Sequence, residues 1–349
     1  MELRDVLLRH AAKYPHWELR DAWKLVYQNE FGCGHFLDDA DASLARLTEE
    51  WSGVPESPGD ACEDVGNGYC RLHLAPAKAM RLSPNTLNRF FVNTANARTG
   101  TVAGFEEKLR LLGEMCAQGA LSFDPGAFAQ AVARHKDAGY PAVSHSAAYR
   151  ARYAPAYRLV DRAYCEFLSL FARIDARLRE KPNPVIAIDG NASAGKTTLA
   201  DLLASVYDCN IVRMDHFFLP PEKRTDARLR EVGGNVDYER FYDEVIAPLG
   251  QSQPFSYRVF DCSIMDFCGQ ADVDPLRPTV VEGSYSHHPH FQNPYDLTVF
   301  LAADLQTQKR RIRERNGAAM LKKFVDVWIP MENAYFDAHG IRESSDLVF

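Results

Sequence analysis

A glycine-bounded loop between an apolar run and a helical segment constrains this fold more than any other feature of the sequence. The stretch VIAIDGNASAGKTTLADLL, residues 185–203, places Gly190, Gly195, Lys196 and Thr197 in the pattern G-x-x-x-x-G-K-[ST], directly after a strand-like run. Glycines let the backbone wrap a phosphate with its N–H groups, and the positive end of the following helix dipole attracts the same anion. The pattern therefore predicts a phosphate-binding loop.

The side chains of this loop predict a nucleoside triphosphate ligand, and we expect ATP with Mg²⁺. Lys196 supplies a mobile cation for the outer phosphates, and Thr197 offers a hydroxyl to Mg²⁺. The alternative is a strand-to-helix turn with an incidental lysine. The expected nucleotide-binding residues are Gly190, Asn191, Ala192, Ser193, Ala194, Gly195, Lys196, Thr197 and Thr198.

The chain of 349 residues is long enough for two domains, and the segment EKPNPV, residues 180–185, marks the boundary between them. Its two prolines and its asparagine separate a charged helical stretch from an apolar run. We expect a mainly α-helical domain of unknown role over residues 1–180 and an α/β P-loop nucleoside-triphosphate-binding domain over residues 181–349.

The two halves differ in their hydrophobic patterns. Helical spacing is seen before the boundary in RDAWKLVYQNEF, GFEEKLRLLGEMCAQ, GAFAQAVARH and APAYRLVDRAYCEFLSLFARIDARL. Between them, SGVPESPGDACEDVGNG is typical of a surface loop and YCRLHL of a short strand. After the boundary, the short apolar runs VIAID, NIVRM, TVVEG, LTVFLA and DLVF alternate with helical segments. This alternation predicts a mostly parallel sheet that is buried on both faces.

The composition argues against a nucleic-acid-binding surface, a membrane span and a disulfide or zinc framework. The formal net charge of -7 argues against a nucleic-acid-binding surface, which needs clustered Lys and Arg. No apolar stretch reaches the length of a membrane span and no signal-peptide core is seen, so we expect a cytoplasmic protein. The eight cysteines favour free thiols, and Cys33, His35, Cys70 and His73 do not have the spacing of common zinc sites. A homo-oligomer stays open.

Two carboxylates follow predicted strands of the second half. Asp215 ends the run NIVRMD and Glu282 ends the run PTVVE. Because the carboxyl ends of strands border the ligand crevice of an open α/β sheet, we expect both acids to face the phosphate loop. There a carboxylate can take a proton from a substrate hydroxyl or hold Mg²⁺. The alternative roles are a helix cap and a salt bridge.

Residues 184–349 resemble the uridine kinase and phosphoribulokinase group of P-loop kinases. The resemblance lies in MDHFF, GGNVDYERF, VVEGSY, DLQTQKRRIRERNG and FSYRVFDCSIMDF. It implies that Asp215 is the general base, that Asn235 and Asp237 line the acceptor site and that Glu282 manages Mg²⁺ together with Thr197. It also implies an arginine-rich lid whose Arg311 and Arg315 contact the phosphates. A solvated helix face is the alternative for these arginines.

The same resemblance gives a hairpin that covers the acceptor, with Tyr257, Arg258 and Asp261 as lining residues; solvated hairpin side chains are the alternative. Tyr238 stands where uridine kinases have a histidine at the base pocket, which leaves base recognition open.

Two segments of the first half are rich in groups that bind ligands. They are YQNEFGCGHFLDD, with Gln28, Glu30, His35 and Asp38, and SHSAAYRARYAPAYR, with His145, Tyr149, Arg150, Tyr153 and Arg158. One interpretation is a polar pocket for an anionic or sugar-like ligand. We favour another: Tyr149, Tyr153 and Tyr157 form one packed helix face, and Pro155 bends or ends that helix.

These features together predict a small-molecule kinase that transfers the γ-phosphoryl group of ATP to an alcohol, with a nucleoside or a sugar-like molecule as acceptor. Two alternatives stay open. One is a kinase of the same fold that acts on a non-nucleoside alcohol or sugar. The other is an ATP-binding regulator, which has no need of a base at Asp215.

Overall fold

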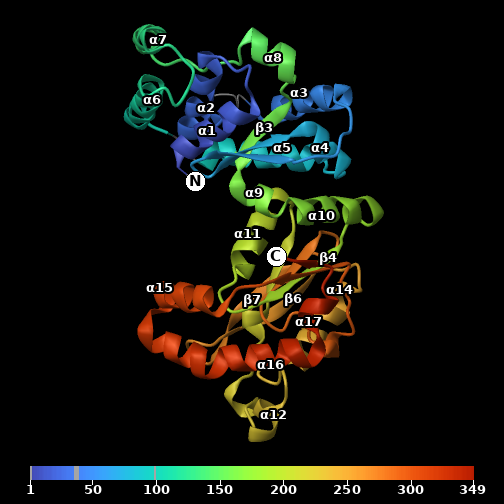
Figure 1. The fold of residues 1–349 in the computed structure, drawn as a ribbon. Coiled ribbons are helices and arrows are strands. Elements are labelled where there is room, and N and C mark those ends of the chain that lie inside the picture. The colour runs from blue at the N-terminus through green and yellow to red at the C-terminus, as the bar shows by residue number, and fades with distance from the viewer. Residues whose placement is uncertain (1, 35–38, 98–99) are drawn as a thin grey trace. The chain divides into compact units, whose positions relative to one another are not determined.

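The structure, a computed structural model, describes residues 2–34, 39–97 and 100–349. The chain folds into two compact units, Met1–Asp175 and Ala176–Phe349, which are described one at a time (Figure 1). The division falls within helix α10, Leu168–Glu180, and the two prolines follow directly after that helix. Over the described residues, no helix combines the length and the apolar character that a membrane crossing needs.

The first unit is mainly helical. Three strands form a small antiparallel sheet in the order β1-β2-β3: β1 Cys62–Gly66, β2 Tyr69–His73 and β3 Tyr157–Asp161. The helices are α1 Leu3–Lys13, α2 Leu19–Phe31, α3 Ala40–Gly53, α4 Leu74–Ala79, α5 Pro84–Ala97, α6 Val102–Ala117, α7 Pro125–Asp137, α8 Ala147–Tyr153, α9 Arg162–Glu166 and α10.

Two expectations about this unit are wrong. The polar stretch at residues 52–68 contains β1 and is a loop only in part. Residues 157–161 form β3 and are not helical, because α8 ends at Ala154, which has a left-handed conformation and is followed by Pro155. A proline cannot continue the helical hydrogen bonds, so the chain leaves α8 extended and pairs with β2. The strand expected at YCRLHL is confirmed as β2.

The core of the first unit lies between α1, α2, α6 and the sheet. Ala22, Trp23 and Val26 of α2 are buried in this core. Phe105, Leu109 and Leu112 of α6 belong to the same cluster. The rings of Trp23 and Phe105 meet edge to face, with centroids 6.1 Å apart. Burial of such side chains is the main stabilising contribution of this unit.

The second unit is an α/β domain built on a five-stranded parallel sheet, as the sequence predicts. The order is β10-β9-β4-β8-β5 and every neighbouring pair is parallel. The strands are β4 Val185–Gly190, β5 Asn210–Arg213, β8 Thr279–Glu282, β9 Leu297–Leu301 and β10 Leu347–Val348. All six residues of β4 and all four of β8 are buried, which explains their continuous apolar runs.

Helices and one hairpin complete this unit (Figure 1). The hairpin expected at FSYRVFDCSIMDF is confirmed as β6 Phe255–Asp261 paired with β7 Asp266–Val273. The helical segments are α11 Lys196–Val206, η2 Met214–Phe217, η3 Pro221–Lys223, α12 Asp226–Arg230, α13 Tyr238–Phe241, η4 Tyr242–Ile246, α14 Ala247–Leu249, η5 Pro289–Phe291, α15 Leu305–Lys323, η6 Phe324–Trp328, α16 Ile329–His339 and α17 Ile341–Ser344.

Candidate functional site

Three neighbouring strands end at the same edge of the parallel sheet and bring the predicted site together. β8 lies between β4 and β5, with Glu282 level with Ile188 on one side and Arg213 on the other. The predicted phosphate loop leaves β4, Glu282 ends β8, and Asp215 follows β5 by two residues. The chain passes from β4 to β5 on one side and later to β9 on the other, so this edge is a topological switch point, where open α/β sheets bind ligands.

The backbone of the phosphate loop requires glycine at its two ends. Gly190 has a φ of 139°, and a Cβ there would lie 2.2 Å from the Leu301 carbonyl oxygen. Gly195 has a φ of 113° and caps the N-terminus of α11. Both conformations are disfavoured for residues with a side chain. The loop therefore joins strand and helix as the glycine pattern predicts.

The side chain of Lys196 folds back over the phosphate loop. Its Nζ donates hydrogen bonds to the carbonyl oxygens of Gly190, at 2.6 Å, and Asn191, at 3.0 Å. The ammonium group is therefore held at the mouth of the loop, where a flexible four-carbon stem can move it toward a phosphate.

Thr197 and Glu282, the two predicted Mg²⁺ residues, are in contact. The Thr197 hydroxyl donates to the Glu282 carboxylate at 3.2 Å, and Arg213 Nη1 lies 2.9 Å from Glu282 Oε1. Burial raises the pKa of Glu282, and repulsion from Asp215 raises it further, although Arg213 opposes both effects. A buried carboxylate beside a second carboxylate favours a cation between them.

Asp215 is exposed at the start of η2, and the structure gives its carboxylate no hydrogen bond or ion pair to any described residue. It does not cap a helix, which was the alternative role. A carboxylate that no protein group occupies is suited to accept a proton from a bound hydroxyl.

The two lid arginines differ. Arg311 Nη1 donates to the carbonyl oxygens of Ser193 and Ala194, each at 3.0 Å, so this side chain reaches the phosphate loop. Arg315 instead donates to the side chain of Asn316, and among the described residues no bond joins it to the loop. α15 breaks at Gly317, which has a φ of 79° and separates the two arginines from the rest of the helix.

The residues predicted to bind the acceptor already have protein partners. Asp237 is 1% exposed, caps α13 and bonds Lys223 Nζ at 2.8 Å. Tyr238 stacks on His288, with centroids 4.5 Å apart, and carries the Arg228 guanidinium on its ring. These contacts give both residues a structural role.

The hairpin residues that were predicted to line the acceptor site also have protein partners. Tyr257 is buried, and its hydroxyl lies 3.1 Å from His216 Nδ1. Arg258 is exposed and its Nε donates to Glu244 at 2.7 Å, whereas Asp261 accepts a bond from the Ser263 N–H at 2.7 Å.

Two buried acids at the loop were missed by the sequence analysis. Asp189, fully buried, accepts bonds from the N–H groups of Gly190 and His287 and from the Tyr335 hydroxyl. Glu332 accepts the N–H of Ala192 at 3.0 Å and the hydroxyl of Ser284 at 2.8 Å, and burial raises its pKa. Glu332 follows the loop by more than a hundred residues, so no local pattern marks it.

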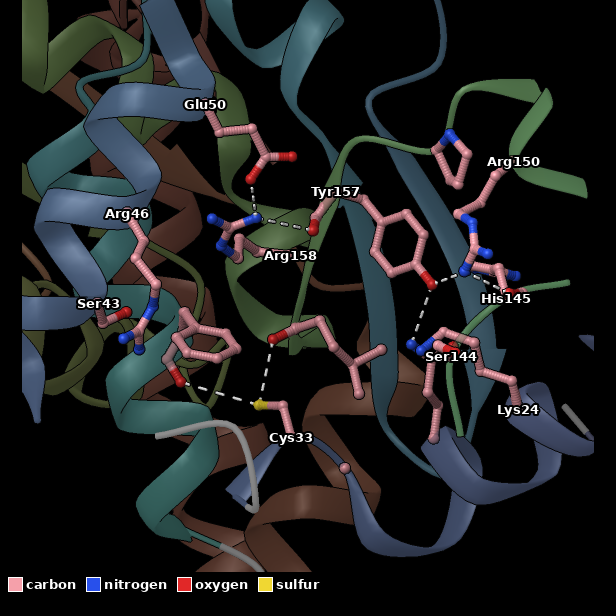
Figure 2. A pocket seen from close by; sticks show the side chains of 15 residues that line it. Lys24, Cys33, Ser43, Arg46, Glu50, Ser144, His145, Arg150, Tyr157 and Arg158 are labelled. Carbon is pink, nitrogen blue, oxygen red and sulfur yellow. Dashed lines mark hydrogen bonds and ion pairs between the residues drawn. The ribbon is translucent and has the colours of Figure 1, made fainter. Parts of the chain in front are cut away.

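The ligand-binding candidates of the first unit lie in different surroundings. Gln28, His145, Arg150 and Arg158 line one cavity of about 670 Å³ (Figure 2). Tyr149 and Tyr153 instead pack on Tyr14, at 5.2 and 5.0 Å between centroids, as the packing interpretation expects. Glu30 is bonded to Lys108 at 2.7 Å, and His35 and Asp38 lie outside the described residues.

No protein-family model and no curated protein matches this chain. Solved structures do resemble it. A possible uridine kinase from Bacillus stearothermophilus is 19% identical, with a TM-score of 0.39, over 52% of this chain and 98% of its own. A protein described as a fructose transport system kinase, from a Silicibacter species, is 21% identical, with a TM-score of 0.42, over 54% and 97%. D-glycerate 3-kinase from Cryptococcus neoformans is 16% identical, with a TM-score of 0.35, over 50% and 88%.

Proposed function

We propose that this chain is an ATP- and Mg²⁺-dependent phosphotransferase that moves the γ-phosphoryl group to a hydroxyl of a small molecule. The observation that carries the proposal is the meeting of the phosphate loop, Glu282 and Asp215, which has no hydrogen-bond partner among the described residues, at the ends of three adjacent strands. Phosphoryl transfer needs a phosphate cradle, oxygen ligands for a metal and a group that receives the hydroxyl proton. This edge of the sheet offers one candidate for each.

In this proposal, Asp215 accepts the proton of the acceptor hydroxyl while the acceptor oxygen bonds to the γ-phosphorus. The bond between that phosphorus and the bridging oxygen breaks, and ADP leaves with the electron pair. Lys196 and Arg311 lie on the loop, where they neutralise charge that grows on the phosphates. Their contribution is positioning and electrostatics rather than covalent chemistry.

The donor set of the site fits Mg²⁺. Thr197 and Glu282 provide hydroxyl and carboxylate oxygens in contact with each other, and Mg²⁺ prefers oxygen ligands. When bound, the metal supplies charge neutralisation on the phosphates. Glu282 and Thr197 would hold it, and Arg213 orients the Glu282 carboxylate.

For the acceptor we propose a nucleoside, on the motif resemblance to uridine kinases. A specific contact favours the alternative of a non-nucleoside alcohol or sugar. Tyr238, which stands where those kinases have a histidine, is held by His288 and Arg228 and by a bond from its hydroxyl to Glu231. A side chain with three partners is less available to a base than an unpaired one.

ADP release with Mg²⁺ and ATP, measured against nucleosides, sugars and hydroxy acids, tests the proposal. We expect at least one acceptor to raise the rate several-fold above the rate without acceptor, and mass spectrometry to find its phosphate ester. Lys196→Ala protein prepared in the same way excludes a contaminating kinase. Binding of ATP without turnover for any acceptor would favour the regulator instead.

A further inference from the structure

The first unit holds a cavity of about 670 Å³ whose wall brings together the two sequence segments that are rich in ligand-binding groups. Gln28 comes from α2, Arg46 and Glu50 from α3, and Tyr157 and Arg158 from β3. Figure 2 shows Arg46, Glu50, Tyr157 and Arg158 around the same space, with His145 and Arg150 beside Tyr157. The cavity is therefore formed by segments that are far apart in the sequence.

The charge of the cavity wall is positive. Of the described residues, Lys24, Arg46, Arg150 and Arg158 line it, against one carboxylate, Glu50. His145 adds no charge near neutral pH, because burial lowers its pKa despite a bond to Asp21. The whole chain has a formal net charge of -7, so this surplus of cations is local.

The arginines keep donors for a ligand. Arg46 has no hydrogen bond or ion pair to any residue in the described part of the chain. Arg150 uses Nη1 for the carbonyl oxygen of His145, at 2.7 Å, and Arg158 uses Nη1 for Glu50, at 2.7 Å. A guanidinium group has five N–H donors, so most of those on each arginine are left for an anion.

A chain of hydrogen bonds in the wall fixes the Tyr157 hydroxyl. Arg71 donates to Gln28 Oε1 at 2.8 Å, Gln28 Nε2 donates to the Tyr157 oxygen at 3.2 Å, and that hydroxyl lies 2.7 Å from His145 Nε2. His145 Nδ1 lies 2.9 Å from Asp21, which can only accept. The donors therefore run in one direction, from Arg71 to Asp21, and the Tyr157 oxygen keeps one lone pair.

We propose that this cavity binds a small hydroxylated molecule that carries a phosphate monoester. The guanidinium groups of Arg46, Arg150 and Arg158 can fork onto phosphate oxygens, and their surplus charge suits a dianion better than a single carboxylate. The Tyr157 oxygen accepts a hydrogen bond from a ligand hydroxyl, and Phe91 and Leu159 contact its carbon skeleton. The inference stands apart from the proposed kinase activity, because it uses no residue of the phosphate loop.

Isothermal titration calorimetry on full-length Lys196→Ala protein tests the inference, because this substitution weakens phosphate binding at the loop. The probes are glycerol 3-phosphate, a pentose 5-phosphate, inorganic phosphate, and glycerate as the carboxylate. We expect one saturable site for at least one ester. Adding Arg46→Ala should weaken that binding about tenfold, as expected for loss of a charge-assisted contact. The matched control is Arg173→Ala, an exposed arginine in α10 that does not line the cavity.

A second variant tests the hydroxyl contact. Tyr157→Phe keeps the ring and should weaken ester binding about fivefold, as expected for loss of one hydrogen bond, while inorganic phosphate binding is unchanged. Absence of ester binding at millimolar concentration would overturn the inference. So would equal binding of glycerate, or an ester affinity that Arg46→Ala and Arg173→Ala leave equally unchanged. Because Arg46 is exposed and has no hydrogen bond or ion pair to a described residue, we expect its removal to leave the fold intact.

Discussion

Two buried acids of the first unit, Glu63 and Asp21, differ from two of the second, Glu282 and Glu332, in the direction of their pKa shifts. In the first unit burial would raise the pKa of Glu63, but Arg71, His10 and Lys13 lower it to about 2. Asp21 is likewise held at a pKa of about 2 by hydrogen bonds that outweigh its burial. In the second unit burial raises the pKa of Glu282 and of Glu332.

This difference indicates which charged groups each unit has available for a ligand. In the first unit, Glu63 and Asp21 are stabilised by their own protein partners. They therefore do not neutralise the arginines that line the cavity. In the second unit the carboxylates of Glu282 and Glu332 at the phosphate loop are only partly compensated, which favours a bound metal cation. We therefore expect substitutions at the loop to change catalysis, and substitutions of the paired acids to change stability.

The largest expected effect is that of Lys196→Ala. A cation at the transferring phosphoryl group is worth about 10³ to 10⁵ in rate, so kcat with the best acceptor should fall by that range. Lys181→Ala is the control, because Lys181 pairs with Asp296 near the start of β4, at the opposite end from the loop. Both proteins should keep the wild-type melting temperature. Full activity in Lys196→Ala would mean that the loop is not a working phosphate site.

Asp215→Asn keeps the size of the side chain and removes its ability to take a proton. We predict a fall in kcat of about 10² to 10⁴, with the KM for ATP nearly unchanged. Steady-state kinetics with both substrates varied separates the two parameters. A lost affinity for ATP would place Asp215 among the metal ligands, and a rate within about threefold of wild type would rule it out as general base.

The third prediction compares the loss of unfolding free energy on replacing one buried acid in each unit. Glu63→Gln leaves Arg71, which is 2% exposed, without its charged partner, so the first unit should lose about 3 to 5 kcal/mol. Glu332→Gln can accept the Ala192 N–H with its amide oxygen and donate its amide N–H to the Ser284 hydroxyl, so it should change the second unit by less than about 1 kcal/mol. Hydrogen exchange resolved by unit measures both losses. Equal losses at the two positions would contradict the comparison.

The dependence of these differences on pH is the smallest expected effect. The lowered pKa of Glu63 means that its contribution is complete above about 4.5 and is lost as the pH falls toward about 2. The stability difference between wild type and Glu63→Gln should therefore shrink over this range. For Glu332 the sign is reversed: its raised pKa makes the charged form unfavourable, and acid relieves that cost. Denaturant titrations at several pH values measure each difference.

The sequence predicts the second unit well, because its signals are local. The loop between Gly190 and Thr197 and the five parallel strands follow from short patterns, and the hairpin at FSYRVFDCSIMDF follows from the family resemblance. Glu332 could not be predicted in this way, because α16 brings it to the loop through tertiary packing.

In the first unit, the helical spacing of Tyr149 and Tyr153 predicts α8, and Pro155 marks its end. The same spacing misplaces Tyr157, because pairing with β2 overrides the pattern in β3. The convergence of Arg46 on the cavity has no signal in the sequence, since it depends on how α3 packs.

One measurement tests the central claim that the two units hold separate sites for different ligands. Hydrogen exchange of the full chain is followed with Mg²⁺ and ATP, and separately with the phosphate ester that binds in the calorimetric titrations. We expect ATP to slow exchange in peptides covering residues 189–198 and to leave residues 144–158 unchanged, while the phosphate ester does the reverse. Protection of the same peptides by both ligands, or no protection of residues 189–198 by ATP, would contradict this claim.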